Sequence, residues 1–154
     1  MFSLFKKKKA ALHSPTTGTL IPLSKVSDPV FAEGMMGPGL AIEPSIAEIY
    51  SPVEGTITTV FPTKHAIGIK SKNGKEILLH IGIDTVELNG EGFDIQVKEG
   101  DIVSPDTLLV RVDHSLLKAK EKASTLMVLF PEEKDLPSVQ ERSVSAKEEI
   151  FSLD

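Results

Sequence analysis

The sequence predicts an all-β protein, a compact antiparallel β-sandwich of the barrel-sandwich type with one or two short helices. Turn residues such as Pro, Gly and Asn recur about every ten residues along the chain. Short runs rich in Val, Ile, Leu and Thr lie between them, and stretches with a helical spacing of apolar residues are few. Many short strands separated by regular turns are typical of a sandwich or barrel.

The expected elements follow these runs in chain order. We expect strands near residues 18–23, 40–44, 55–60, 65–70, 76–81, 93–97, 108–112 and 126–130, and a last strand near 149–153. The best helical segment is 113–122, because Asp113 can cap its first turn and Leu116 and Leu117 can cover a core. Residues 28–34 predict a single helical turn.

A short internal repeat supports a two-sided β fold. The segment SPTTGTL at residues 14–20 recurs as SPVEGTI at residues 51–57. Two copies are too few for a solenoid, so the repeat favours a pseudo-symmetric sandwich in which each half supplies an equivalent strand. The alternative is chance, because Ser, Pro, Gly and Thr are common turn residues.

Length and composition indicate one globular domain. The 154 residues divide into a flexible basic N-terminal tail over 1–11 and a single domain over 12–154. A net charge of -5 without a concentrated basic face argues against nucleic acid as a partner. The absence of cysteine excludes thiolate nucleophiles, disulfides and cysteine-ligated metals.

The first residues, MFSLFKKKKA, indicate a cytoplasmic protein. Their lysines follow a very short apolar stretch, which is the reverse of a secretory signal. The tail offers two alternatives: weak contact with an anionic membrane surface, or a frayed and solvated segment.

A histidine-containing hairpin is the most informative segment. Asn73-Gly74 between two apolar runs favours a two-residue type I′ loop. Counting outward from that loop puts Ile67 opposite His80 and His65 opposite Gly82, so the two histidines lie on one face as diagonal neighbours. A bulged loop that shifts the register by one residue would put them on opposite faces.

Two neighbouring imidazoles beside a glycine predict phosphoryl chemistry. A lone strand histidine is more often a packing residue, but a neutral imidazole carries a lone pair that can attack phosphorus. Gly82 would leave space for a phosphoryl group, and a second histidine or a threonine hydroxyl can hold the reactive tautomer. No nucleotide-binding motif is present, so we expect a phosphoprotein donor and no cofactor.

The residues around this hairpin resemble a known family. LLHIGIDTVELNGEGF at 78–93, together with FPTKHA at 61–66, resembles the IIA domain of the glucose family of phosphotransferase systems. DPVFAE at 28–33 and AIEP at 41–44 extend the likeness, which runs from about Leu12 to Val128. The resemblance implies a phosphotransferase component that serves sugar uptake. The histidine phosphocarrier protein would phosphorylate it, and it would donate to the IIB domain of a sugar permease.

The resemblance also implies roles for individual residues. His80 would carry the phosphoryl group, His65 would stabilise it, and Thr63 would hydrogen-bond His65. Asp28 and Asp84 match carboxylates that flank the family's active site, although Asp28 can also be a helix cap and Asp84 a turn residue. An apolar docking rim is implied at four residues that can equally be core residues: Phe31, Phe61, Leu78 and Val86.

Two other functional classes compete with this interpretation. The same face can belong to a regulatory docking protein of sugar metabolism that transfers nothing. A zinc hydrolase using His65 and His80 would need a third ligand, and neither H-x-H nor H-E-x-x-H spacing occurs, so we expect no metal. His13 and His114 have no partner pattern and are predicted to be surface histidines.

Overall fold

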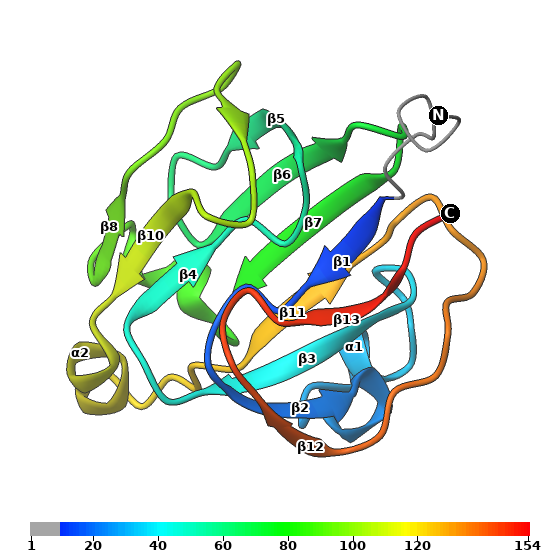
Figure 1. The fold of residues 1–154 in the computed structure, drawn as a ribbon. Coiled ribbons are helices and arrows are strands. Elements are labelled where there is room, and N and C mark those ends of the chain that lie inside the picture. The colour runs from blue at the N-terminus through cyan, green and yellow to red at the C-terminus, as the bar shows by residue number, and fades with distance from the viewer. Residues whose placement is uncertain (1–9) are drawn as a thin grey trace, which may run out of the picture.

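Three antiparallel sheets form the framework of the protein in the computed structural model, which describes residues 10–154 (Figure 1). Most of the predicted basic tail, residues 1–9, lies outside the described residues. The largest sheet has eight strands in the order β12-β2-β3-β11-β7-β6-β5-β9. A three-stranded sheet has the order β4-β10-β8, and β1 pairs with β13. The predicted all-β class is therefore confirmed, and residues 10–154 contain two short α-helices and two short 3-10 helices beside the strands.

The strands are β1 (Ala11–His13), β2 (Gly18–Pro22), β3 (Gly39–Pro44), β4 (Glu48–Tyr50), β5 (Gly55–Val60), β6 (Ala66–Ser71), β7 (Glu76–Ile81), β8 (Phe93–Ile95), β9 (Ile102–Val103), β10 (Leu108–Val112), β11 (Leu126–Leu129), β12 (Arg142–Val144) and β13 (Glu149–Ser152). The helices are η2 (Leu23–Lys25), α1 (Pro29–Ala32), η3 (Thr85–Leu88) and α2 (His114–Ala119). No helix within residues 10–154 is long and apolar enough to cross a membrane.

All the strands expected from the sequence are present, and four short ones were not expected. These are β1, β4, β9 and β12, each of two or three residues. Such segments form because neighbouring strands pair with them, which a local propensity does not reveal. Ala10 is buried and Ala11 begins β1, so these two residues of the predicted tail are part of the fold.

The core divides at the eight-stranded sheet. On one face, Ile77, Leu79 and Ile81 of β7 join the large apolar cluster shared with the smaller sheets. On the other face, Leu78 packs against a small cluster beneath α1, which includes Phe31. Because side chains alternate along β7, His80 belongs with Leu78 on the face of the small cluster.

The internal repeat leads into two equivalent strands, β2 and β5, as predicted. Ser14 and Ser51 are both fully buried, and each hydroxyl donates to the backbone carbonyl two residues later, at 2.7 and 2.6 Å. A Cβ added to Gly18 or Gly55 would lie 2.1 or 2.2 Å from a carbonyl oxygen of the neighbouring strand. Glycine at both positions therefore allows β2 to approach β3 and β5 to approach β6.

The predicted type I′ loop of the histidine hairpin is wrong by one residue. Lys70 pairs with Glu76, and the Ser71 amide donates to the Lys75 carbonyl at 2.8 Å, which leaves 72–74 as the loop. Gly74 has a φ of 89°, the left-handed conformation expected at the end of a three-residue hairpin loop. Consequently Ala66, and not Ile67, lies opposite His80.

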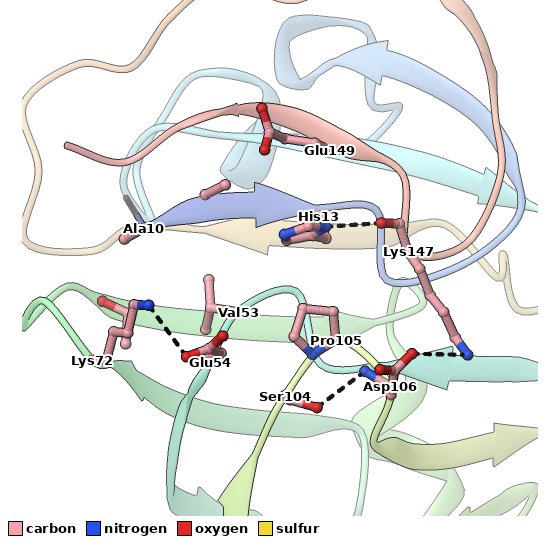
Figure 2. A pocket seen from close by; sticks show the side chains of 12 residues that line it. Ala10, His13, Val53, Glu54, Lys72, Ser104, Pro105, Asp106, Lys147 and Glu149 are labelled. Carbon is pink, nitrogen blue, oxygen red and sulfur yellow. Dashed lines mark hydrogen bonds and ion pairs between the residues drawn. The ribbon is translucent and has the colours of Figure 1, made fainter. Parts of the chain in front are cut away.

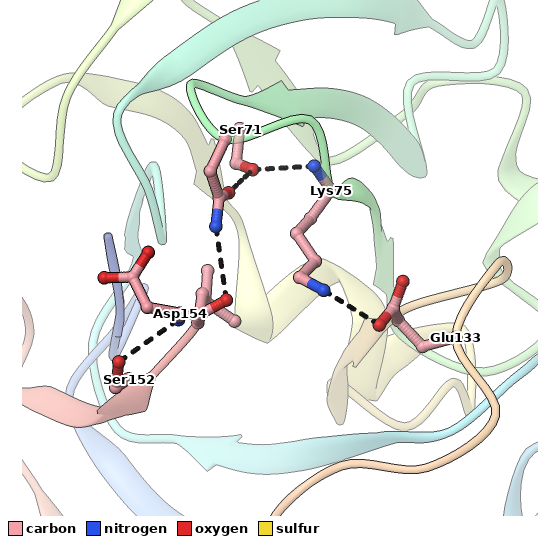
Figure 3. A network of polar contacts seen from close by, with 7 residues as sticks. Ser71, Lys75, Glu133, Ser152 and Asp154 are labelled. Atoms are coloured by element: carbon pink, nitrogen blue, oxygen red, sulfur yellow. Dashed lines mark hydrogen bonds and ion pairs between the residues drawn. The ribbon is translucent and has the colours of Figure 1, made fainter. Parts of the chain in front are cut away.

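Side-chain contacts hold this loop in place (Figure 3). The Ser71 hydroxyl donates to the Asn73 amide oxygen and accepts from the Lys75 backbone amide. The Asn73 amide nitrogen in turn donates to the Leu153 carbonyl at 3.2 Å. The loop is thus bonded to the C-terminal segment, a long-range contact that the local Asn-Gly signal does not contain.

Candidate functional site

The two hairpin histidines lie against each other on the small-cluster face of the sheet. The ring centroids of His65 and His80 are 5.0 Å apart, and the ring planes meet at 79°. Phe31 lies 4.7 Å from the His80 ring, and Phe61 lies 5.7 Å from the His65 ring. The predicted proximity of the two histidines is confirmed.

The reason for this proximity differs from the one predicted. In the observed register Ile81 lies opposite His65, because its amide donates to the His65 carbonyl at 2.7 Å. Strict alternation would then separate the two rings. His65, however, precedes β6 and belongs to a loop in which Lys64 adopts a left-handed φ of 61°. Because His65 is outside the strand, its side chain can turn toward His80.

Gly82 does not provide the open space that the sequence suggested. It has a φ of 80°, and a Cβ at this position would lie 2.5 Å from Cγ2 of Thr85 and 2.8 Å from the Ala123 carbonyl oxygen. The side of Gly82 that lacks a side chain is therefore filled by neighbouring atoms. Glycine is needed here for the left-handed turn that follows His80.

A backbone hydrogen bond selects the tautomer of His80. Its Nδ1 lies 2.9 Å from the Gly82 carbonyl oxygen, which can only accept a hydrogen bond. Nδ1 therefore carries the hydrogen in the neutral ring, and Nε2 keeps its lone pair. His80 thus presents Nε2 as a nucleophile.

Thr63 holds the second histidine, as the resemblance implied. Its Oγ1 lies 2.7 Å from Nδ1 of His65, and the contact joins residues of the same loop. A hydroxyl can donate or accept, so this contact is compatible with either tautomer of His65. When the hydroxyl donates, Nε2 of His65 carries the hydrogen and can donate to an anion.

The surroundings keep both imidazoles neutral. Burial lowers the pKa of His65. Burial is also the main cause that lowers the pKa of His80, and the neighbouring His65 lowers it further. The Gly82 carbonyl, Asp28 and Asp84 act in the opposite direction without reversing the net decrease. At neutral pH the His80 lone pair is therefore available.

This electrostatic balance predicts the titration of His80. We expect its midpoint, followed by NMR of the ring protons, to lie below the ordinary value of about 6.5. Asp28→Asn should lower the midpoint further, because the charge is lost while asparagine can still cap α1. A wild-type midpoint above 6.5, or an upward shift in Asp28→Asn, would contradict this account.

The two carboxylates occupy different local positions. Asp28 is the N-cap of α1, and its Oδ1 accepts from the Val30 amide at 2.9 Å, which confirms the capping alternative. Asp84 precedes η3 in a left-handed conformation with a φ of 60° and makes no capping hydrogen bond. Both act on His80 through their charge.

The implied docking rim divides into buried and exposed residues. Phe31 and Leu78 pack into the small apolar cluster, and Phe61 is half-buried against His65. Val86 is 48% exposed. The sequence analysis missed three exposed apolar residues in or just after α1: Val30, Met35 and Met36. Their signal in the sequence was that apolar residues surround the predicted helical turn on every side, since only one face of a short helix can lie against the core.

The remaining histidines, which were predicted to be surface residues, are half-buried, and one ring nitrogen of each has a backbone partner. Nδ1 of His13 donates to the Lys147 carbonyl at 2.8 Å, and Nε2 of His114 donates to the Ile46 carbonyl at the same distance. His13 lines a cavity of about 490 Å³ beside β1 and β13 (Figure 2). Neither His65 nor His80 lines this cavity.

Metal ligands do not gather in the part of the chain that the structure describes. Across residues 10–154, no group of three or more His, Cys, Asp or Glu side chains is placed to hold a metal ion.

Comparisons with known proteins find a matching family model, a similar sequence and a similar structure. The family model described as "phosphoenolpyruvate-dependent sugar phosphotransferase system, EIIA 1" matches residues 10–136. The "PTS system glucose-specific EIIA component" of Oceanobacillus iheyensis is 46% identical over 123 residues, which is 80% of this chain and 74% of that protein. The structure of glucose permease IIA from Mycoplasma capricolum superposes with a TM-score of 0.84 at 39% identity, covering 96% of this chain and 97% of that chain.

Proposed function

The chain belongs to the EIIA 1 family of the phosphoenolpyruvate-dependent sugar phosphotransferase system, and from this premise we propose that His80 carries the phosphoryl group with His65 as its partner. The chain is a phosphotransferase component that serves sugar uptake, and its partners are phosphotransfer proteins of the same system. One matched protein is named a glucose-specific EIIA component and the other a glucose permease IIA, and neither name refers to regulatory docking.

One observation carries the proposed roles. The bond from Nδ1 of His80 to the Gly82 carbonyl leaves Nε2 free, and the ring of His65 lies 5.0 Å from that of His80. In the transfer step, the Nε2 lone pair attacks phosphorus while the phosphorus–nitrogen bond of the donor's phosphohistidine breaks. The donor imidazole leaves with the electron pair. The hydrogen stays on Nδ1 of His80 and keeps its hydrogen bond to the Gly82 carbonyl.

The neighbouring groups act on the charges of this step. Nε2–H of His65 donates to the phosphoryl oxygens when the Thr63 hydroxyl donates to its Nδ1. Asp28 and Asp84 favour positive charge on the His80 ring while phosphorus is being transferred. They also repel the bound phosphoryl group, which keeps the phosphorylated state able to donate onward.

We infer the histidine phosphocarrier protein as the donor and a IIB domain cysteine as the acceptor. A histidine donor suits a site with no nucleotide-binding motif. The names of both relatives refer to glucose, so a glucose-type IIB domain is the first acceptor to supply.

Intact mass spectrometry tests this function. The protein is incubated with phosphoenolpyruvate, enzyme I and the histidine phosphocarrier, and we expect the mass to rise by one phosphoryl group. Addition of the IIB domain should return the mass to its starting value. An unchanged mass with an active donor would contradict the proposal.

Two exposed apolar residues support apolar docking of these partners: Val30, which precedes the Phe31 that contacts His80, and Val86, which follows His80 in the chain. Val86→Asp should slow acceptance from the phosphocarrier about tenfold, because it puts an uncompensated charge into a contact worth about 1.4 kcal/mol. The matched control is Ile102→Asp on the edge strand β9, where the side chain is 87% exposed. Stopped-flow transfer rates for both variants give the comparison.

The outcome that would contradict apolar docking is a wild-type rate for Val86→Asp, or an equal loss of rate in Ile102→Asp.

Phe31 is unsuited to this test. Its side chain is buried against His80, so truncation to alanine would cost about 3–5 kcal/mol of folding stability as well as any contact with a partner.

A further inference from the structure

The tautomer of His80 depends on where the Gly82 carbonyl points, and neighbouring groups hold that carbonyl in place. The Gly82 amide donates to the Thr125 carbonyl at 2.8 Å, and the Ile83 amide donates to the Ala123 carbonyl at 3.1 Å. These two bonds attach the turn after β7 to the segment that leads into β11. They do not satisfy the carbonyl of Ile81, which lies between His80 and Gly82 in the chain.

Thr85 satisfies the Ile81 carbonyl. It is fully buried in the first turn of η3, and its hydroxyl donates to the Ile81 carbonyl oxygen. A buried carbonyl that loses its partner costs about 1–3 kcal/mol, so removal of this hydroxyl would favour a rearranged turn.

Thr85 also contacts the far side of Gly82. A Cβ built on Gly82 would lie 2.5 Å from Cγ2 and 3.2 Å from Oγ1 of Thr85. The Thr85 hydroxyl therefore holds the peptide unit before the Gly82 α-carbon, and its methyl group fills the side of that α-carbon where a side chain would lie. Rotation of the backbone at Gly82 would move the Gly82 carbonyl away from Nδ1 of His80.

We propose that Thr85 is a positioning residue for phosphoryl transfer, which holds the 81–83 turn so that the Gly82 carbonyl accepts from His80 and Nε2 remains the free nitrogen. The inference rests on the proposed role of His80. Which nitrogen of a neutral imidazole keeps its lone pair is set by the hydrogen bond that the other nitrogen donates. Loss of the Thr85 hydroxyl therefore lets the hydrogen move to Nε2, where it blocks the lone pair.

The test compares three variants. Thr85→Val removes the hydroxyl and keeps the shape, and Thr85→Ser keeps the hydroxyl. Thr16→Val is the matched control, because Thr16 is also fully buried and its hydroxyl donates to the Glu48 carbonyl at 2.8 Å, away from the histidines. Nitrogen-15 NMR of the ring reports the tautomer of His80, and the transfer assay reports the rate.

We expect wild type, Thr85→Ser and Thr16→Val to show His80 with hydrogen on Nδ1 and similar acceptance rates. Thr85→Val should show a population with hydrogen on Nε2 and accept phosphoryl groups about tenfold more slowly. A wild-type ring with hydrogen on Nε2 would overturn the proposal without any variant. Thr85→Val with an unchanged tautomer, or Thr16→Val with an equal loss of rate, would also overturn it.

A replacement variant and a measurement that does not depend on phosphoryl transfer make the outcome decisive. If Thr85→Val does not fold, Thr85→Ala provides the same comparison, because it also removes the hydroxyl while Thr85→Ser again retains it. The tautomer is measured without phosphoryl transfer, so a changed tautomer in a protein that is phosphorylated elsewhere would disprove the role of His80 and leave the role of Thr85 in the turn supported.

Discussion

His80→Gln is expected to accept no phosphoryl group from the histidine phosphocarrier. Glutamine is similar in length and polarity, but it has no ring nitrogen with a lone pair to attack phosphorus. The side chain lies half-exposed at the sheet face, so the fold should survive the change. Intact mass after incubation with phosphoenolpyruvate, enzyme I and the phosphocarrier measures the effect, which should be complete.

His13→Gln is the matched control for this variant. His13 is likewise half-buried, and its ring also donates to a backbone carbonyl, that of Lys147, but it lines a cavity that contains neither site histidine. It should be phosphorylated at the wild-type rate. A His80→Gln protein that still gains an acid-labile phosphoryl group would show that another residue carries it.

His65→Gln is expected to become phosphorylated but to pass the group to a IIB cysteine roughly 10²- to 10³-fold more slowly, within the range that a positioned acid–base group contributes. The glutamine amide can still donate to phosphoryl oxygens, so the phosphorylated state forms. It cannot take up a proton as charge develops, as an imidazole can. The decay of the phosphorylated mass after addition of a IIB domain measures the transfer.

Thr63→Val should also slow transfer to the IIB cysteine, but by less than His65→Gln does. It removes the only hydrogen bond made by the His65 ring within the described residues. A His65→Gln protein that never becomes phosphorylated would reverse the assignment of the two histidines. A His65→Gln protein that transfers at the wild-type rate would remove His65 from the mechanism.

The sequence predicted the strands of this fold better than their register. The apolar runs identify β5, β6 and β7 because each buries one face against a shared core. Asn73-Gly74 locates the hairpin but not its loop type, since the structure uses the Asn73 side chain to bond the distant Leu153 carbonyl. A long-range contact of this kind decides between two loops that are both favourable locally.

The histidine pair was predicted correctly although the predicted register was wrong. The alternation argument assumed that His65 lies within β6, whereas it lies in the preceding loop, where Lys64 takes a left-handed conformation. Nothing in the side-chain pattern signals that conformation, because a lysine with positive φ is uncommon. The T-x-H-A segment indicated His65 through resemblance, and the structure supplies the physical reason for its proximity to His80.

The docking rim could not be predicted from the sequence for a different reason. Apolar residues near a site can be core or surface, and their type alone does not distinguish the two. Phe31 was assigned to the rim and is mostly buried under His80, while Met35, at 73% exposure, was not assigned at all. Only the three-dimensional position of α1 over the sheet separates these residues.

The most direct test of the account is to locate the phosphorus atom in the phosphorylated protein. Protein labelled uniformly with nitrogen-15 is phosphorylated by the phosphocarrier, and the coupling between phosphorus and the ring nitrogens is recorded by NMR. We predict coupling to Nε2 of His80, with the hydrogen on Nδ1 still bonded to the Gly82 carbonyl. Phosphorus coupled to Nδ1 of His80, or to either nitrogen of His65, would contradict the account.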